Sequence, residues 1–204
     1  MVAMSVRSRL ESGLGQSGRT VTVFLEQLVG EPIDAHERHH VMTQAGARDP
    51  LGVAEGHPVL QRSAVLRGRR SAKPYLRAHT LLVPSRLPPG FCRQLETSTD
   101  PIGRILVESG VCFTRAPLPP ALGPANPFTH AISPEDHLMA RMYRVDVDGV
   151  AVMVIAEWFL AALRPFLLEY SQVTEDDDPR HDTGAATEHG TTSTDTRHTG
   201  WLGW

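Results

Sequence analysis

The chain contains little of what metal, disulfide and covalent-cofactor sites are built from. Its only cysteines, Cys92 and Cys112, form no CxxC pair, so neither a disulfide framework nor a cysteine zinc site is expected. It has no Walker loop and no GxGxxG element. Its single lysine, Lys73, lies in a polar run, which argues against a pyridoxal phosphate enzyme. We therefore expect a protein that uses no cofactor and no metal.

Signals for membranes, secretion and nucleic acids are also missing. No apolar run approaches the roughly 18–20 residues that a membrane-spanning helix needs. The polar N-terminus lacks the apolar core of a signal peptide. A net charge of −3 disfavours a nucleic-acid partner. These absences, together with two unpaired thiols, predict a cytoplasmic protein without a membrane or nucleic-acid partner.

Composition divides the 204 residues into one domain and two flanking segments. Residues 1–17 are polar and small, and we expect them to be disordered. Residues 171–204 form an acidic, threonine-rich tail with a net charge of −5, for which we also expect disorder. The domain is predicted over residues 18–170. Without the tail the chain carries a net charge of +2, which suits a small anionic ligand.

Local patterns predict an antiparallel α+β domain. The expected elements are a helix from Val21 to Gly30, a hairpin over 59–83, a helix over 101–110, a strand over 111–115, a long loop over 116–136, a hairpin over 139–159 and a final helix over 160–168. The second hairpin turns at Asp148-Gly149, a pair typical of type I′ turns. No βαβ alternation is present, so a Rossmann-like fold is disfavoured.

Two groups of polar residues could carry chemistry. The histidines of His36–His40 suit a metal only on a helix, but the stretch resembles a strand in which Arg38 would oppose a cation. More informative are Arg62 and Glu157, which interrupt apolar strands. Burying either charge is costly without compensation. They could pair with each other as a buried ion pair, or line a ligand pocket.

Three stretches carry a resemblance to a known family: GHPVLQRSAVLRGRRSAKPYLRAHTLLVPSRLPPGF, TDPIGRILVESGV and ARMYRVDVDGVAVMVIAEWFL. They resemble, in this order, the chorismate pyruvate-lyase family, which makes 4-hydroxybenzoate and includes mycobacterial-type enzymes. The similarity runs from about Thr20 to Arg164. Its most specific parts are the elements at Thr99–Gly103 and Ala156–Leu160.

The resemblance implies a twisted antiparallel sheet of about six strands with helices on one face, and a buried aromatic-acid site under flaps. It implies that Arg62 binds the ring carboxylate, that Glu157 meets the 4-hydroxyl, and that the backbone N–H groups of Val21 and Ile102 also hold the carboxylate. Gly103, in the same element as Ile102, is expected to bind substrate as well.

The implied reaction is the elimination of pyruvate from chorismate, a small-molecule substrate, without a cofactor or metal. Because chorismate is a dianion, a second cation is expected, with Arg67, Arg141 and Arg144 as candidates. Two alternatives stay open. One is a related enzyme that acts on another carboxylated intermediate of natural-product biosynthesis. The other is a non-catalytic, UTRA-like ligand-binding domain as in GntR-type regulators. Such regulators carry a winged helix before this domain, and about 20 N-terminal residues cannot hold one.

Overall fold

One six-stranded antiparallel sheet organises the molecule. The computed structural model describes residues 5–15, 20–47, 49–119 and 136–173. Within these ranges the sheet order is β1-β2-β3-β6-β5-β4. The strands are β1 (Ile33–Gln44), β2 (Pro58–Gly68), β3 (Pro74–Leu82), β4 (Phe113–Leu118), β5 (His137–Val147) and β6 (Val150–Leu160). The α+β class and the twisted antiparallel sheet predicted from the sequence are confirmed.

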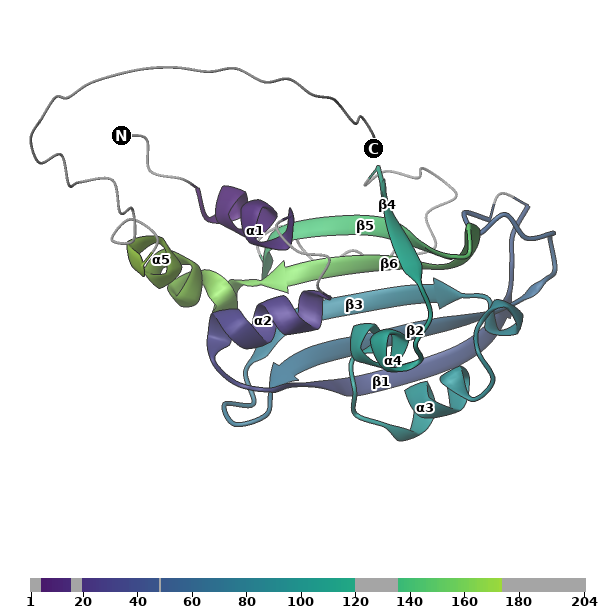
Figure 1. Ribbon diagram of the computed structural model, residues 1–204, viewed down its shortest axis with the longest axis horizontal. Coiled ribbons are helices and arrows are strands. Elements are labelled where there is room, and N and C mark those ends of the chain that lie inside the picture. The colour runs from purple at the N-terminus through teal and green to yellow at the C-terminus, as the bar shows by residue number, and fades with distance from the viewer. Residues whose placement is uncertain (1–4, 16–19, 48, 120–135, 174–204) are drawn as a thin grey trace, which may run out of the picture.

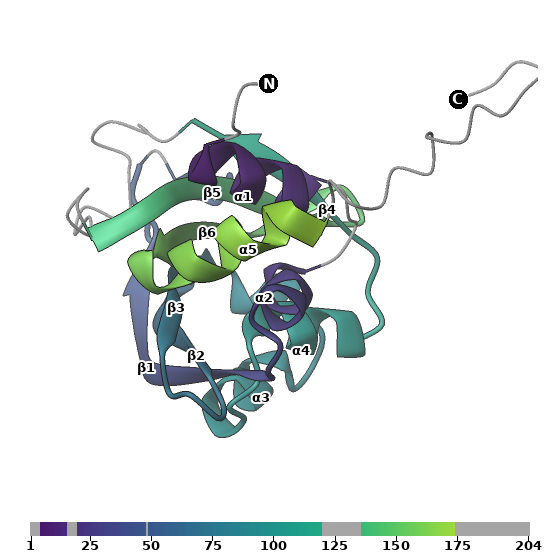
Figure 2. The same cartoon turned by 90° about the vertical axis from the view of Figure 1, so that its left-hand side faces the viewer.

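The helices gather on one face of this sheet (Figures 1 and 2). They are α1 (Val6–Gly15), α2 (Val21–Val29), α3 (Phe91–Thr97), α4 (Ile102–Glu108) and α5 (Arg164–Val173), with short 3-10 turns η1 (Pro84–Arg86) and η4 (Ala161–Leu163). Two apolar clusters fill the space between helices and sheet. One includes Leu25 and Phe159, and the other includes Ile105 and Met153.

Local signals place the elements that frame the site. Thr20 caps α2 by accepting a hydrogen bond from the N–H of Val23 at 3.4 Å, and Gly30 ends the helix with φ 69°. The hairpin of β5 and β6 turns at Asp148 (φ 50°) and Gly149 (φ 77°). Positive φ at both central residues is what a type I′ turn requires, so that prediction is confirmed.

The predicted disorder of residues 1–17 is wrong for α1. Val6, Leu10 and Leu14 recur every fourth residue and form one apolar stripe between serines and arginines. Leu10 is fully buried, and the Arg9 guanidinium donates to the carbonyl of Leu167 in α5 at 2.8 Å. The N-terminal segment therefore adds a helix to the domain. The acidic tail beyond residue 173 lies outside the described residues.

Two other expectations need correction around α4 and β4. We expected the helix over 101–110 to begin at Pro101, but α4 begins at Ile102 with Pro101 at its cap, so Asp100 does not cap this helix. The Asp100 carboxylate accepts hydrogen bonds from Ser98 and Arg104 instead. β4 extends to Leu118, into the predicted loop over 116–136, of which residues 120–135 lie outside the described part.

A buried carboxylate fixes the turn between β2 and β3. Glu31, 7% exposed, accepts hydrogen bonds from the backbone N–H groups of Arg70 (2.8 Å) and Ser71 (3.0 Å) and from the Tyr75 hydroxyl (3.2 Å). Burial alone would raise the pKa of Glu31, but these hydrogen bonds outweigh it and lower the pKa to about 2.

Among the described residues, no helix is both long and apolar enough to cross a membrane. The cytoplasmic location stays a prediction.

Candidate functional site

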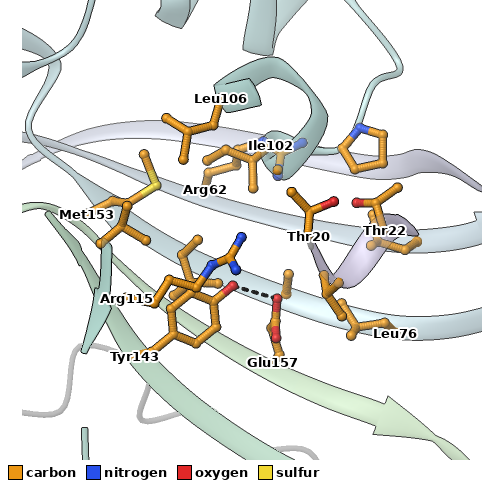
Figure 3. A pocket seen from close by; sticks show the side chains of 17 residues that line it. Thr20, Thr22, Arg62, Leu76, Ile102, Leu106, Arg115, Tyr143, Met153 and Glu157 are labelled. Carbon is orange, nitrogen blue, oxygen red and sulfur yellow. Dashed lines mark hydrogen bonds between the residues drawn. The ribbon is translucent and has the colours of Figure 1, made fainter. Parts of the chain in front are cut away.

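A cavity lies between the sheet and the starts of two helices, and it contains about 510 Å³ of empty space, part of it open to solvent. The sheet supplies its floor, and α2 and α4 supply its rim (Figure 3). Its lining is mainly apolar, with few polar groups, as in typical small-molecule sites. The lining residues are Thr20, Val21, Thr22, Arg62, Leu66, Leu76, Ala78, Pro101, Ile102, Gly103, Leu106, Arg115, Tyr143, Val145, Met153, Ile155 and Glu157.

All five site residues predicted from the sequence line this cavity. They are Arg62, Glu157, Val21, Ile102 and Gly103. They come from two strands and two helix starts that lie far apart in the sequence. The structure thus brings them together, while their roles toward a ligand stay predictions.

Arg62 is a buried cation without a carboxylate partner in the described part of the chain. It lies in β2, is 2% exposed, and donates from Nε to Nε2 of His40 at 3.2 Å. One terminal nitrogen of its guanidinium has no hydrogen-bond partner among the described residues. Burial, with a smaller effect of the nearby Arg38 charge, lowers the pKa of Arg62 to about 10. The group is still charged near neutral pH and can bind an anion.

Glu157 has partners of its own, so of the two alternatives left open by the sequence, the ion pair with Arg62 is not formed. Glu157 lies in β6 and is 2% exposed. One carboxylate oxygen accepts from Nε of Arg141 at 2.7 Å. The other accepts from the Tyr143 hydroxyl at 2.9 Å (Figure 3). Strand register explains the pairing, because Arg141 is directly opposite Glu157 on β5. Arg62 aligns with Thr80, two residues and two strands away from Glu157.

Tyr143 holds its proton firmly. It is buried against Glu157, and burial, followed by the charge of that carboxylate, raises its pKa well above the usual value. The phenol therefore donates to Glu157 and leaves one lone pair on each carboxylate oxygen for a ligand hydroxyl.

Two helix starts place backbone and hydroxyl donors at the rim. Val21 and Ile102 are the first residues of α2 and α4, where the N–H groups have no acceptor within the helix. Thr22 is 1% exposed, and its hydroxyl has no partner in the described part of the chain. A Cβ atom on Gly103 would lie 3.0 Å from Cβ of Thr20, so only glycine lets the two helix starts approach this closely.

A polar network fixes α4 against α2. The Arg104 guanidinium pairs with Asp100 at 2.9 Å and also with Glu26 of α2. Glu26 also accepts from the backbone N–H of Ile33, where β1 begins, at 3.0 Å. The backbone N–H of Ala35 donates to the carbonyl of Thr99 at 2.7 Å. These contacts give the Thr99–Gly103 element its position over the cavity.

The second cation at this cavity is Arg115, which sequence reasoning missed. It lies in β4 and lines the cavity. The three arginines that we expected in this role do not line the cavity. Arg67 pairs with Glu37, Arg141 with Glu157, and Arg144 with Asp146. Tyr143 and Thr22 were also missed, and His40 was considered only as a metal ligand. Its contact with Arg62 depends on strand pairing, which places the two residues directly opposite each other.

The described residues contain no cluster of three or more histidine, cysteine, aspartate or glutamate side chains that could hold a metal ion. His36–His40 lies in β1, as expected of a strand, with a β-bulge between His36 and His39.

The relatives found by comparison with known proteins share one name. No protein-family model matches the chain. A protein named chorismate pyruvate-lyase from Mycobacterium tuberculosis is 26% identical over 152 residues, which cover 73% of this chain and 76% of that protein. A Mycobacterium bovis protein of the same name matches equally well. The chain is therefore similar in sequence to proteins named chorismate pyruvate-lyase over about three quarters of its length. The resemblance noted in the sequence is thereby confirmed.

Solved structures that are similar to this chain have other names. The effector domain of PhnF from Mycobacterium smegmatis matches with a TM-score of 0.42 and 17% identity, covering 71% of this chain and 90% of that one. The longer PhnF structure matches with a TM-score of 0.41 and 17% identity, covering 72% of this chain and 66% of that one. A GntR-family transcriptional regulator from Bacillus cereus matches with a TM-score of 0.35 and 17% identity, covering 62% and 93% of the two chains.

Proposed function

We propose that this chain is a lyase that eliminates pyruvate from chorismate and forms 4-hydroxybenzoate. One observation carries the proposal: Arg62 is a buried guanidinium whose terminal nitrogen has no partner among the described residues, in a largely apolar cavity that also contains Glu157. A cation buried without a carboxylate partner is costly to the fold, and an anionic ligand offsets that cost. The names of the homologues supply the substrate.

The ring carboxylate binds at the Arg62 end of the cavity. A guanidinium presents parallel N–H donors that match the two oxygens of a carboxylate. The hydroxyl of Thr22 and the backbone N–H groups of Val21 and Ile102 add donors from the rim. The apolar floor, including Leu76 and Ile155, contacts the ring faces.

The 4-hydroxyl binds at the Glu157 end. The carboxylate of Glu157 is held on one oxygen by Arg141 and on the other by Tyr143, so its direction is fixed before substrate arrives. It accepts a hydrogen bond from the substrate hydroxyl. Arg62 and Glu157 then contact opposite ends of one ring, which orients it in the cavity.

The elimination needs little beyond this orientation. The bond between C3 and the ether oxygen breaks, and its electron pair leaves with enolpyruvate. The hydrogen on C4 departs as a proton, and its bonding pair completes the aromatic ring. One proton is taken up by the methylene carbon of the released enolpyruvate, which gives pyruvate and balances the reaction without another reactant. Aromatisation provides the driving force. The fixed charges of Arg62 and Glu157 hold the substrate in a mainly apolar cavity.

The test is incubation of the purified chain with chorismate, with pyruvate and 4-hydroxybenzoate measured separately. We expect both products in equal amounts, and the same rate after dialysis against EDTA. Glu157→Gln keeps the side-chain shape and removes the charge, so kcat should fall by about ten- to a hundredfold. Asp146→Asn, which removes a carboxylate outside the cavity, is the matched control and should leave kcat unchanged.

Two results would count against the proposal. Binding of 4-hydroxybenzoate without turnover of chorismate would favour the ligand-binding alternative. Failure to bind 4-hydroxybenzoate at all would remove the aromatic-acid site itself.

A further inference from the structure

We propose that Arg115 binds the second carboxylate of the substrate, so that the cavity selects a dicarboxylate over a monocarboxylate. This inference rests on the proposed function and specifies which group recognises the enolpyruvyl side chain.

The position of Arg115 is fixed by its strand and by two aromatic rings. Arg115 lies in β4 and is paired with Val145 of β5, the strand that also contains Tyr143. Its guanidinium lies 5.0 Å from the ring centre of Phe113 and 6.0 Å from that of Tyr143. Stacking of this kind holds a guanidinium while leaving its in-plane N–H donors directed outward.

Arg115 and Arg62 approach the cavity from different halves of the sheet. Arg62 is on β2 and Arg115 on β4, with β3, β6 and β5 between them. Figure 3 shows Arg115 beside Tyr143, and Arg62 on the far side next to Ile102. Two cations on separate walls fit a ligand whose two carboxylates lie at different ends.

The charges at the cavity are consistent with a dianion. The ionised groups that line it are Arg62, Arg115 and Glu157, and Arg141 is paired to Glu157 from outside the lining. The lining thus contains two guanidinium groups, on separate walls, which suits a ligand with two carboxylates.

The position also suits the leaving group. When the bond between C3 and the ether oxygen breaks, negative charge moves onto the departing enolpyruvate. A guanidinium that already holds its carboxylate lies close to that developing charge and stabilises it. 4-Hydroxybenzoate, which lacks the side chain, does not use this cation.

The decisive experiment compares two ligands on one variant. In Arg115→Gln, we expect KM for chorismate to rise by about ten- to a hundredfold, because a charge-assisted hydrogen bond is lost. The Kd for 4-hydroxybenzoate should change by less than about threefold. Arg115→Lys keeps the charge without the planar donors and should recover part of the loss in KM. Arg144→Gln, which removes an arginine paired with Asp146 on the neighbouring strand, should change neither value.

The outcomes separate this inference from the proposed function. Equal losses for both ligands, or no loss for chorismate, would overturn the role of Arg115 even if the wild-type protein releases pyruvate. If the wild-type protein binds chorismate without turnover, the proposed function fails. In that case the Kd values of Arg115→Gln for chorismate and for 4-hydroxybenzoate test the role of Arg115. A selective loss of chorismate binding supports the role, and an equal or absent loss refutes it.

Discussion

Replacing Arg62 with methionine separates a ligand-binding role from a structural one. Burial lowers the pKa of Arg62 from its usual range to about 10, which corresponds to about 3 kcal/mol against the charged form. Methionine fills similar space without charge and loses one hydrogen bond to His40, worth about 1 kcal/mol. The free energy of unfolding should therefore stay level or rise by about 2 kcal/mol. For a chain of this length that is a rise in Tm of roughly 4–8 °C.

Ligand binding should change in the opposite direction. Loss of a buried charge-assisted hydrogen bond to the ring carboxylate costs about 1.5–3 kcal/mol, or about ten- to a hundredfold in Kd for 4-hydroxybenzoate. Thermal unfolding and calorimetric titration of the same sample measure both quantities. Arg69→Met is the control: Arg69 pairs with Asp34 through two hydrogen bonds, so its loss should lower Tm and leave Kd unchanged. A large drop in Tm for Arg62→Met, with unaltered affinity, would show that the reasoning is wrong.

Three further predictions concern the rim, His40 and the hairpin turn. Gly103→Ala places a Cβ 3.0 Å from Cβ of Thr20 and pushes the two helix starts apart. Titration should therefore show several-fold weaker binding of 4-hydroxybenzoate, a loss of roughly 1 kcal/mol. Unchanged affinity would contradict the close approach of the helix starts. Burial, then the charge of Arg62, lowers the pKa of His40 below 6.5, so this acceptor is neutral at pH 7. The affinity for 4-hydroxybenzoate should fall as pH drops through the pKa of His40. In His40→Gln, which keeps a hydrogen-bond acceptor, titrations at several pH values should show no such dependence. The pKa of Glu31 is lowered from 4.5 to about 2, so the ionised carboxylate stabilises the fold above pH 4.5 and this effect is lost as pH falls toward 2. Glu31→Gln should flatten the curve of Tm against pH between these values. An unchanged slope would refute the role of Glu31.

Elements with strong local signals could be predicted from the sequence. The Asp148-Gly149 turn needs only two residues in positive φ, and α2 has a threonine cap and a glycine end. α1 escaped prediction because its stripe of three apolar residues is short, and its stability comes from packing against α5.

The site was predicted in part because charges inside apolar strands stand out. Arg62 and Glu157 were identified in this way, but their partners depend on strand register. Arg62 and Glu157 are two strands and two residues apart, roughly 12 Å between Cα atoms, whereas Arg141 is opposite Glu157. Arg115 reaches the cavity only through the pairing of β4 with β5, a contact between distant segments that no local pattern encodes.

A crystal structure with 4-hydroxybenzoate bound shows whether Arg62 and Glu157 hold the two ends of one aromatic acid. We expect the carboxylate within hydrogen-bond distance of the Arg62 nitrogen that has no partner among the described residues, and the hydroxyl within hydrogen-bond distance of Glu157. A ligand bound in the reverse direction, or outside the cavity between α2, α4 and the sheet, would contradict it.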